Sequence, residues 1–290
     1  FEIELDADII RKKDLTLSVG INGTHYRTTL LSVPADQIPN YDETMDLPKG
    51  CWTVATEDMA QAGTASHAGR GIFYLRGEGK DLFNLYMPKY AGVDEKSGLP
   101  LYWHRVTYYD VNMNETTGVY EHGGRYANYK VGDNVKTDVA ADASYYEVGS
   151  ATPDWIGGLT LSLKWKDFDF SVVSAYQIGG KFFSMEYSQH LFRGSSMGRQ
   201  RIPVSKDLVG NTWNPDNTSA YYPMQWFPSS GASSYYLDGS LLPGSHNYTD
   251  MSLFDASYFR VKNVTIGYTL PKKLLYSRTT GTTVAPLGPD

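Results

Sequence analysis

The chain has 290 residues, a formal net charge of −6, and 41% hydrophobic and 20% charged residues. This balance excludes a disordered or collagen-like chain, and its acidic sign gives no reason to expect a nucleic-acid partner. The single cysteine, Cys51, excludes an internal disulfide and a cysteine-rich zinc site. No apolar run reaches the roughly 18 residues of a transmembrane helix. The 14% of aromatic residues, together with 28 Gly and 14 Pro, favour β-structure with long loops.

The N-terminal segment predicts a β-hairpin. Apolar and acidic residues alternate from Phe1 to Ile9, which is the period of a strand with one apolar face. The charged residues 11–14 predict a turn, and the alternation resumes at Leu15 and continues past Ile21. Because the pattern is already present at residue 1 and no signal peptide precedes it, we expect the chain to be a piece of a longer protein.

Three further regions carry strand patterns. Residues 72–75 and 83–87 predict a weaker hairpin around a turn at 78–81. Residues 159–165 and 168–176 alternate on either side of the two-residue turn at 166–167, which predicts a second long hairpin. A last strand is predicted from Tyr258 to Thr269, and its alternation changes parity near Asn263, which indicates a β-bulge.

The connections between these strands, about seven long ones in all, alternate in length. Tight turns are expected at 11–14, 78–81, 166–167 and 271–273, and long links at about 33–69, 93–153 and 179–256. This alternation is typical of a transmembrane β-barrel, which has short periplasmic turns, long outer loops and strands of about 9–12 residues. Aromatic residues near the predicted strand ends match the girdles of such a barrel: Tyr26, Trp155, Trp165, Phe168, Tyr176 and Tyr268. The alternative is an ordinary all-β soluble protein with decorated loops.

Three stretches together resemble a known family. They are Tyr90-Ala91-Gly92-Val93-Asp94 with Pro100-Leu101-Tyr102; Gly149-Ser150 with Pro153, Trp155, Gly157-Gly158 and the YQIGGK run of residues 176–181; and the DASYFRVKNVTIGYTLP run of residues 255–271. In this order they resemble the C-terminal half of a SusC/RagA-type TonB-linked outer-membrane transporter. The segment from Asp8 to Thr24 fits the same family.

The resemblance implies a fold and a location. Residues 1–275 are expected to form part of a large antiparallel transmembrane β-barrel of roughly 22 strands, with long extracellular loops. The expected location is the outer membrane of a Bacteroidota-like bacterium. Residues 276–290 are expected to form an irregular tail, because this stretch shows no strand pattern. The plug domain and the remaining barrel strands are expected to lie outside this chain, either in a longer parent or in a separate chain.

The resemblance also implies a function. The expected activity is active import of a bulky nutrient, an oligosaccharide or a peptide, with TonB acting on the absent plug. A SusD-like surface lipoprotein that lids the barrel is the expected partner. No cofactor is implied, and no pair of carboxylates indicates a glycan-cleaving enzyme. A soluble carbohydrate-binding β-module remains the alternative function.

Aromatic residues in the long links are candidate substrate-binding residues: Trp103, Tyr108, Trp213, Tyr221, Tyr222 and Trp226. Aromatic faces stack on the C–H faces of sugars, while neighbouring polar side chains bind the hydroxyl groups. Packing the links together or contacting a lid protein is the more common role for such residues, because interfaces are rich in Tyr and Trp. Both roles stay open at the level of sequence.

The remaining polar candidates are weaker. Asp94-Glu95, and Asp110 with Asn112 and Asn114, offer oxygen ligands for Ca²⁺ but lack the spacing of a complete loop, so solvated turns are expected. The histidines show no paired metal motif and are expected in surface loops: His67, His104, His122, His190 and His246. The glycine pairs 157–158 and 179–180 are expected where the wall bends or where another backbone passes close.

Overall fold

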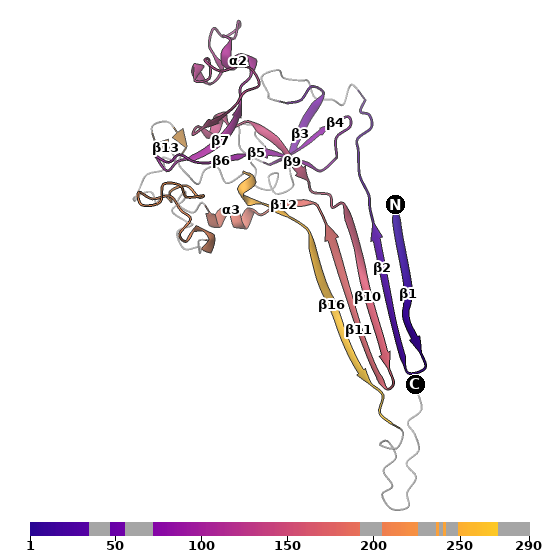
Figure 1. The fold of residues 1–290 in the computed structure, drawn as a ribbon. Helices are drawn as coiled ribbons and strands as arrows, with labels where there is room; N and C mark the ends of the chain where they lie inside the picture. Colours follow the sequence, from indigo (N-terminus) through magenta and orange to yellow (C-terminus); the bar gives the residue numbers. More distant parts are fainter. Residues whose placement is uncertain are drawn as a thin grey trace, which may run out of the picture. The chain divides into compact units, whose positions relative to one another are not determined.

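The computed structural model describes residues 1–34, 47–55, 72–191, 205–225, 236–237, 240–241 and 249–271. The chain divides into two compact units (Figure 1). Unit 1 consists of Phe1–Tyr26, Asp154–Ile178 and Ser257–Asp290, and unit 2 consists of Arg27–Pro153 and Gly179–Ala256. None of the described helices combines the length and the hydropathy that a membrane-spanning helix requires.

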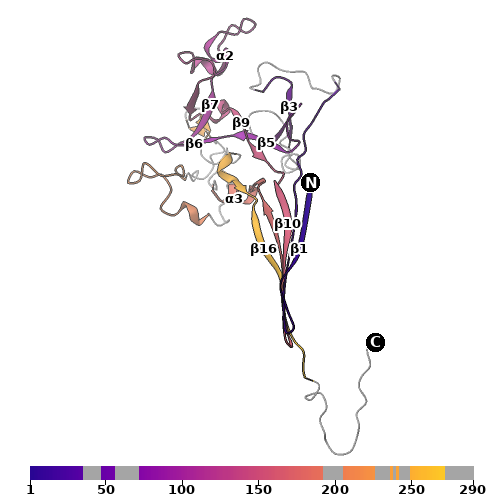
Figure 2. The same ribbon diagram turned by 45° about the vertical axis from the view of Figure 1, so that its right-hand side comes forward.

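Unit 1 is one antiparallel five-stranded sheet with the order β1-β2-β10-β11-β16. Its strands are β1 (Glu2–Lys12), β2 (Leu15–Thr24), β10 (Trp155–Trp165), β11 (Phe168–Ile178) and β16 (Tyr258–Tyr268). Figure 2 views this sheet nearly edge-on and shows that the strands form a single layer. The described part of the sheet is open, with β1 and β16 as its two edges.

The strand register collects most of the apolar positions of unit 1 on one face, with Ile156 and Val173 as exceptions on the other. Leu5 pairs with Ile21, which pairs with Leu159, and the next rows repeat this arrangement. The apolar face therefore carries Leu15, Leu17, Val19, Ile21, Leu159, Leu161, Leu163, Phe170, Val172, Val261, Val264 and Ile266. The polar face carries Asp6, Asp8, Ser18, Thr160, Ser162, Ser171 and Thr265. Paired residues share a face, so the same alternation extends across the five strands, with register shifts in β1 and β16.

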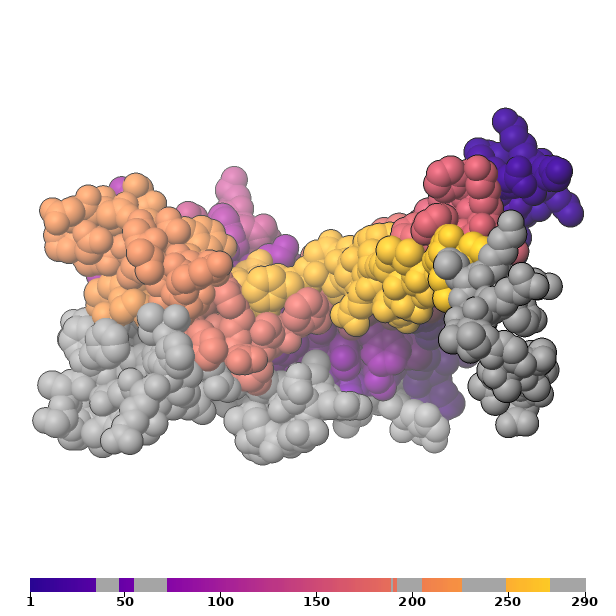
Figure 3. All heavy atoms as spheres, turned by 90° about the horizontal axis from the view of Figure 1, so that it is seen from below, coloured from indigo at the N-terminus to yellow at the C-terminus, as the bar shows by residue number. Residues whose placement is uncertain are grey.

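The apolar face is not a buried core. On the edge strand β16, Ile266 is 75% exposed and Phe259 is 61% exposed. Leu159, Leu161 and Leu163 in the centre of the sheet are only half-buried. Figure 3 shows the atoms of β16, in yellow, uncovered along the strand. A continuous apolar surface across five strands calls for a non-aqueous neighbour.

Aromatic side chains lie at both ends of the apolar face. At the end with the tight turns, the ring of Phe168 lies 6.2 Å from that of Trp165 and 4.5 Å from that of Tyr268. At the other end, Trp155 contacts Phe1 with the ring centroids 5.3 Å apart. Five of the six residues predicted for an aromatic girdle therefore lie in the sheet at its ends, and Tyr26 follows the end of β2.

The structure confirms the two long hairpins and the bulge near Asn263. The ladder between β11 and β16 shifts register between Val173 and Ser174, where Lys262 is the extra residue. A second bulge, at Ile9 in β1, was not predicted, because the alternation up to that residue shows no break. The two-residue turn at 166–167 has Lys166 at a φ of 51°, as a tight hairpin of this kind requires.

The described part of unit 2 contains four small sheets and several short helices. One sheet has the order β3-β4-β5-β9 and a second has β6-β7-β8, while β12 pairs with β15 and β13 pairs with β14. The strands are β3 (Cys51–Ala55), β4 (Phe73–Gly77), β5 (Asn84–Pro88), β6 (Tyr90–Val93), β7 (Pro100–Arg105), β8 (Asn134–Thr137), β9 (Tyr145–Ser150), β12 (Lys181–Phe183), β13 (Tyr236–Leu237), β14 (Ser240–Leu241) and β15 (Leu253–Asp255). The helical segments are α2 (Tyr108–Val111), η2 (Glu121–Gly124), η3 (Ala140–Asp142), α3 (Met185–Leu191), η6 (Lys206–Leu208) and η7 (Asp250–Ser252).

Unit 2 has hydrophobic cores of its own. One core gathers Ile72, Leu85, Met87 and Val148, and another gathers Phe73, Leu75 and Tyr86. Both cores lie on the β4–β5 hairpin, in which every residue of β5 is buried. Since a buried strand of this kind shows no alternation, its pattern in the sequence is weak.

Two predictions made from the sequence are wrong for unit 2. The hairpin at 72–87 was counted among the long wall strands, but β4 and β5 have five residues each and belong to unit 2. The regions 93–153 and 179–256 were expected to be loops, yet they contain short strands, helices and buried side chains. The predicted tail at 276–290 lies outside the described residues.

Gly157 on β10 leaves space for the Tyr176 side chain to reach from β11 to β2. The Tyr176 hydroxyl donates a 2.9 Å hydrogen bond to the Asn22 carbonyl on β2, and its ring passes over Gly157 on β10. A methyl group at Gly157 would overlap the Asn22 carbonyl and lie 2.7 Å from the Tyr176 ring. The expectation of a close backbone approach is confirmed here. It also holds at Gly180, where an added methyl would meet the Ala151 carbonyl at 3.2 Å.

We predict that Gly157→Ala weakens the pairing of β2 with β10 by roughly 1–3 kcal/mol, because the methyl group has no space. Amide hydrogen exchange of the two strands measures this effect. Ser162→Ala is the matched control, since Ser162 lies on the same strand with an exposed side chain. Equal protection in both variants would contradict the prediction.

Candidate functional site

Unit 2 brings part of the predicted aromatic set together. Trp213, Tyr221 and Tyr222 lie on one segment, 205–225. Tyr221 packs against β6, Tyr222 against α3 and Trp213 against the β6–β7 turn. Trp226 lies outside the described residues. Trp103 lies on β7 and Tyr108 lies on α2. Figures 1 and 2 both show α2 well away from the orange segment 205–225. The sequence therefore named residues of two separate surfaces.

Trp213 is held in place by the β6–β7 turn. Its indole Nε1 donates to the Glu95 carbonyl at 3.1 Å, and its ring covers Gly98, where a methyl group would lie about 2.6 Å from the ring carbons. Gly98 has a φ of +73°, so both the backbone and the space require glycine there. Asp94 closes this turn by accepting from Ser97, and that hydrogen bond lowers the pKa of the Asp94 carboxyl. Asp94 thus acts as a turn residue, as the solvated-turn reading predicts.

Four tyrosines, Tyr90, Tyr187, Tyr221 and Tyr222, form what we call the tyrosine cluster. The Tyr90 hydroxyl donates to the Tyr221 carbonyl at 2.7 Å, and the rings of Tyr221 and Tyr222 meet edge-on with centroids 4.9 Å apart. The Tyr187 hydroxyl donates to Asp207 at 2.7 Å, so it accepts from Tyr222, whose hydroxyl lies 3.2 Å away. Sequence reasoning missed Tyr90 and Tyr187, because they belong to other elements than Tyr221 and Tyr222.

The tyrosine cluster is uncharged near neutral pH. Burial raises the pKa of Tyr90, and it likewise raises the pKa values of Tyr187 and Tyr221. The phenols therefore stay protonated and act as neutral donors and acceptors. Tyr221 is the member that faces outward, with 58% of its surface exposed. The cluster thus offers an aromatic face with hydroxyl groups beside it.

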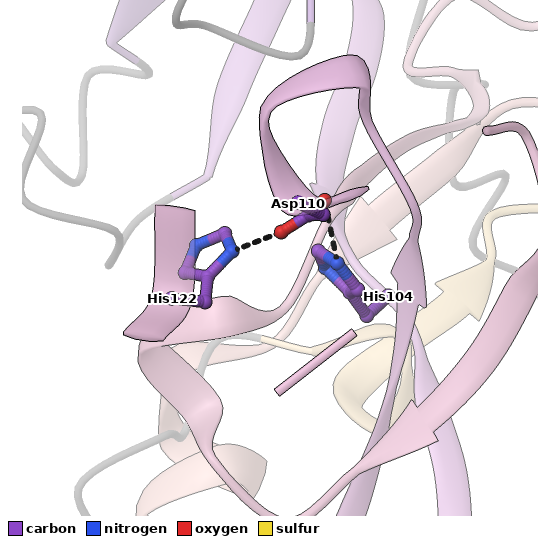
Figure 4. A group of neighbouring side chains, drawn as sticks. All are labelled: His104, Asp110 and His122. Atoms are coloured by element: carbon purple, nitrogen blue, oxygen red, sulfur yellow. Dashed lines mark hydrogen bonds and ion pairs between the residues drawn. The ribbon is translucent and has the colours of Figure 1, made fainter. Parts of the chain in front are cut away.

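A second constellation, the His–Asp–His cluster, consists of His104 on β7, Asp110 in α2 and His122 in η2. Figure 4 shows the Asp110 carboxylate between the two imidazole rings. His104 Nε2 lies 3.1 Å from Asp110 Oδ2, and His122 Nδ1 lies 2.7 Å from Asp110 Oδ1. His104 is 1% exposed and Asp110 is fully buried. The prediction that these residues sit in solvated surface turns is therefore wrong for His104 and Asp110.

The local backbone explains how Asp110 comes to lie there. Thr107 precedes α2, and its amide donates to Asp110 Oδ2 at 2.7 Å in a capping box. His122 has a φ of 51°, an uncommon conformation that turns its ring toward Asp110. Burial opposes the charge on Asp110, but hydrogen bonds from His104, His122 and Thr107 outweigh it and lower the pKa of the carboxyl. Burial opposes the charge on His122 as well, and the Asp110 and Asp142 carboxylates raise its pKa.

Asp142 supports the same cluster from η3. Its backbone carbonyl lies 2.7 Å from His104 Nδ1, and its carboxylate accepts two hydrogen bonds from Arg125, at 2.9 and 3.0 Å. The Tyr126 hydroxyl donates to the same carboxylate at 2.8 Å, and the Tyr126 ring lies 4.1 Å from that of His104. Asp142 therefore links the His–Asp–His cluster to Arg125 and Tyr126.

A nucleophilic role for Ser144 is not supported by this geometry. Its hydroxyl lies 3.4 Å from His104 Nδ1, but that nitrogen already faces the Asp142 carbonyl at 2.7 Å. Ser144 Oγ also accepts the Arg105 amide and is 6% exposed, so substrate has no approach to it. A reacting serine needs an exposed hydroxyl with a free base beside it.

Comparisons with known proteins bear on the fold. No family model matches the chain. A curated relative, TonB-dependent receptor P3 of Formosa agariphila, is 26% identical over 128 residues, which cover 44% of this chain and 10% of that protein. The structure also matches that of the RagAB peptide transporter, with a TM-score of 0.58 and 19% identity, over 96% of this chain and 23% of that one. The RagAB peptide importer in its 'open-open' state matches with a TM-score of 0.53 and 18% identity.

The resemblance to SusC/RagA-type TonB-linked transporters is confirmed. The similarity to the solved RagAB structures extends to the fold of nearly the whole chain. The chain spans about a tenth of the length of the curated relative and about a quarter of the length of the solved transporters. The chain is therefore similar to only a portion of each of these longer proteins.

We predict that Asp110→Asn destabilises the region around β7 and α2 by about 3 kcal/mol, because an amide turns a donor toward partners that need an acceptor. Hydrogen exchange of the β7 and α2 amides measures the local free energy of opening. The exposed Asp138→Asn is the matched control and should change it by less than about 0.5 kcal/mol. Similar effects of the two substitutions would disprove the structural role of Asp110.

Proposed function

We propose that this chain forms part of the wall and outer segments of a SusC/RagA-type, TonB-dependent importer in a bacterial outer membrane. The observation that carries the proposal is the apolar face of unit 1, which five strands build in register. In a soluble module, that face would need a second layer of protein. In a barrel, it faces the hydrocarbon and needs none.

The dimensions of the apolar face support this role. Trp155 and Trp165 mark the ends of β10 and are ten residues apart, which corresponds to about 33 Å along a strand. At the tilt of about 35–45° that is usual in barrels, this length spans a height of about 25 Å. That height equals the apolar band of outer-membrane barrels, and the aromatic rows at both ends match its girdles.

The polar face then lines the aqueous lumen. Its row of acidic and hydroxyl side chains, including Asp6, Asp8, Ser18, Thr160 and Ser162, suits contact with water. Within the described residues, the outer edges of β1 and β16 have no neighbouring strand, and lipid does not tolerate unpaired backbone groups, so we propose that both pair with further strands in the membrane. We propose that these strands, the plug and the TonB contact belong to other parts of the transporter, and that a SusD-like lipoprotein lids it.

The chemistry of the tyrosine cluster favours an oligosaccharide as the imported nutrient. Tyr221 presents an exposed aromatic ring, and the phenol groups beside it are neutral. Such a surface suits sugar rings and hydroxyl groups, which carry no charge. A peptide, the cargo named for the RagAB transporter, is the competing possibility.

The orientation of the wall can be tested with two adjacent cysteines. In a Cys51→Ala background, we predict that a membrane-impermeant maleimide reacts with Ser162→Cys several-fold faster than with Leu161→Cys. The two positions are neighbours on β10 and face opposite sides of the sheet. A lipid-soluble quencher should show the reverse preference. Equal labelling of both positions by both reagents would refute a membrane wall.

The role of Tyr221 can be tested by truncation. We predict that Tyr221→Ala weakens oligosaccharide binding about 2–10-fold, because one stacking contact contributes about 0.5–1.5 kcal/mol. Tyr108→Ala is the matched control, since Tyr108 is 59% exposed and lies on the other surface. Binding is measured by isothermal titration with oligosaccharides and, in parallel, with peptides.

Each outcome of this experiment has a clear meaning. A loss of peptide binding alone would replace the oligosaccharide with a peptide as the cargo. A loss confined to Tyr108→Ala would move the binding surface to α2. If neither variant changes the binding of either ligand, the exposed aromatics do not contact the cargo.

A further inference from the structure

We propose that His104, Asp110 and His122 form a binding site for one divalent transition-metal ion, with zinc as the best fit. The site belongs to unit 2 and is independent of the proposed transport function. It joins three elements, β7, α2 and η2. Neither Cys51 nor any residue of the tyrosine cluster takes part.

The donor atoms are already close to the spacing that zinc requires. One donor atom from each of the three residues lies within 4.8 Å of the other two. Zinc binds nitrogen and oxygen at about 2.0–2.2 Å, so the donors of a tetrahedral site lie roughly 3.3–3.5 Å apart. The 3.1 Å between His104 Nε2 and Asp110 Oδ2 is near that value, whereas His122 Nδ1 lies 2.7 Å from Asp110 Oδ1. The His122 ring must therefore move away from Asp110 by roughly 0.6 Å for one ion to bind all three residues.

The orientation of His104 is that of a metal ligand. Its Nδ1 lies 2.7 Å from the Asp142 carbonyl, which can only accept, so Nδ1 carries the proton. His104 Nε2 then faces Asp110 Oδ2 at 3.1 Å, so the space between these two atoms takes either a proton or a metal ion. Metal-ligating histidines use their second nitrogen in this way, to bond a backbone carbonyl. The Tyr126 ring, 4.1 Å away, fixes the imidazole further.

Asp110 has the supporting contacts of a ligating carboxylate. The Thr107 amide donates to Asp110 Oδ2, and the Thr107 hydroxyl lies 2.8 Å from the same oxygen. Such contacts orient a carboxylate and are typical of residues around a metal ion. The Asp142 carboxylate is engaged elsewhere: Arg125 donates two hydrogen bonds to it, and His122 Nε2 lies 4.0 Å from it.

The ligand set selects the class of ion and leaves a path to it. Ca²⁺ and Mg²⁺ prefer oxygen ligands, whereas two imidazoles and one carboxylate suit zinc and related ions. His122 is partly exposed, with 24% of its side chain open to solvent, so an ion can reach the site from that side. Three protein ligands leave at least one coordination position for water. A bound ion would cross-link the segment from β7 to η2 and stabilise it by mass action.

The test uses the full chain in detergent, stripped of metal with EDTA. We expect isothermal titration with Zn²⁺ to show one ion per chain, and titration with Co²⁺ to give the visible absorption of a four- or five-coordinate ion. His122→Asn should weaken Zn²⁺ binding at least about tenfold. His190→Asn is the matched control, because His190 lies in α3 and is not one of the three ligands, and it should bind as the unaltered chain does.

Several results would overturn the proposal. The absence of stoichiometric Zn²⁺ binding would show that the cluster is a hydrogen-bonded network without an ion. Equal binding by His122→Asn and His190→Asn would place the ion elsewhere. Circular dichroism without metal shows whether His122→Asn is folded. If it is not, X-ray absorption of the unaltered Zn²⁺-loaded chain decides: two imidazoles with oxygen support the site, and sulfur or all-oxygen coordination refutes it.

Discussion

Registered alternation of side chains in unit 1 is the constraint on which the other features of that sheet depend. A single alternating strand fits many folds, but five neighbours whose rows coincide make a continuous apolar surface on one side. Each square ångström of such a surface costs about 25 cal/mol in contact with water. The tight turns at one end, the aromatic rows at both ends and the single layer are all consistent with hydrocarbon as the neighbour.

Unit 2 achieves stability in a different way. Its short strands bury small cores around Met87 and Leu75, and a network of polar side chains links β7, α2, η2 and η3. Buried polar networks contribute to a defined structure only when their members are satisfied. The contacts among His104, Asp110, His122 and Asp142 meet that condition with either a proton or a metal ion between His104 and Asp110.

Similarity of fold and identity of cargo are separate matters. The likeness to the RagAB structures concerns the path of the chain, at 19% identity. Cargo is selected by side chains on the segments between strands, such as Trp213 and Tyr221, and those can change while the wall is kept. The tyrosine cluster is therefore the part of unit 2 from which the nature of the nutrient can be argued.

The sequence by itself determined the long strands, the turn at 166–167 and the bulge near Asn263, because strand alternation is local and can be read along one segment. It also indicated the family through runs such as residues 255–271. Tertiary structure alone decided that the hairpin at 73–88 belongs to unit 2, because a fully buried strand has no period of two. It alone brought together His104, Asp110 and His122, whose separations along the chain match no regular element, so only the folded backbone places their side chains within reach.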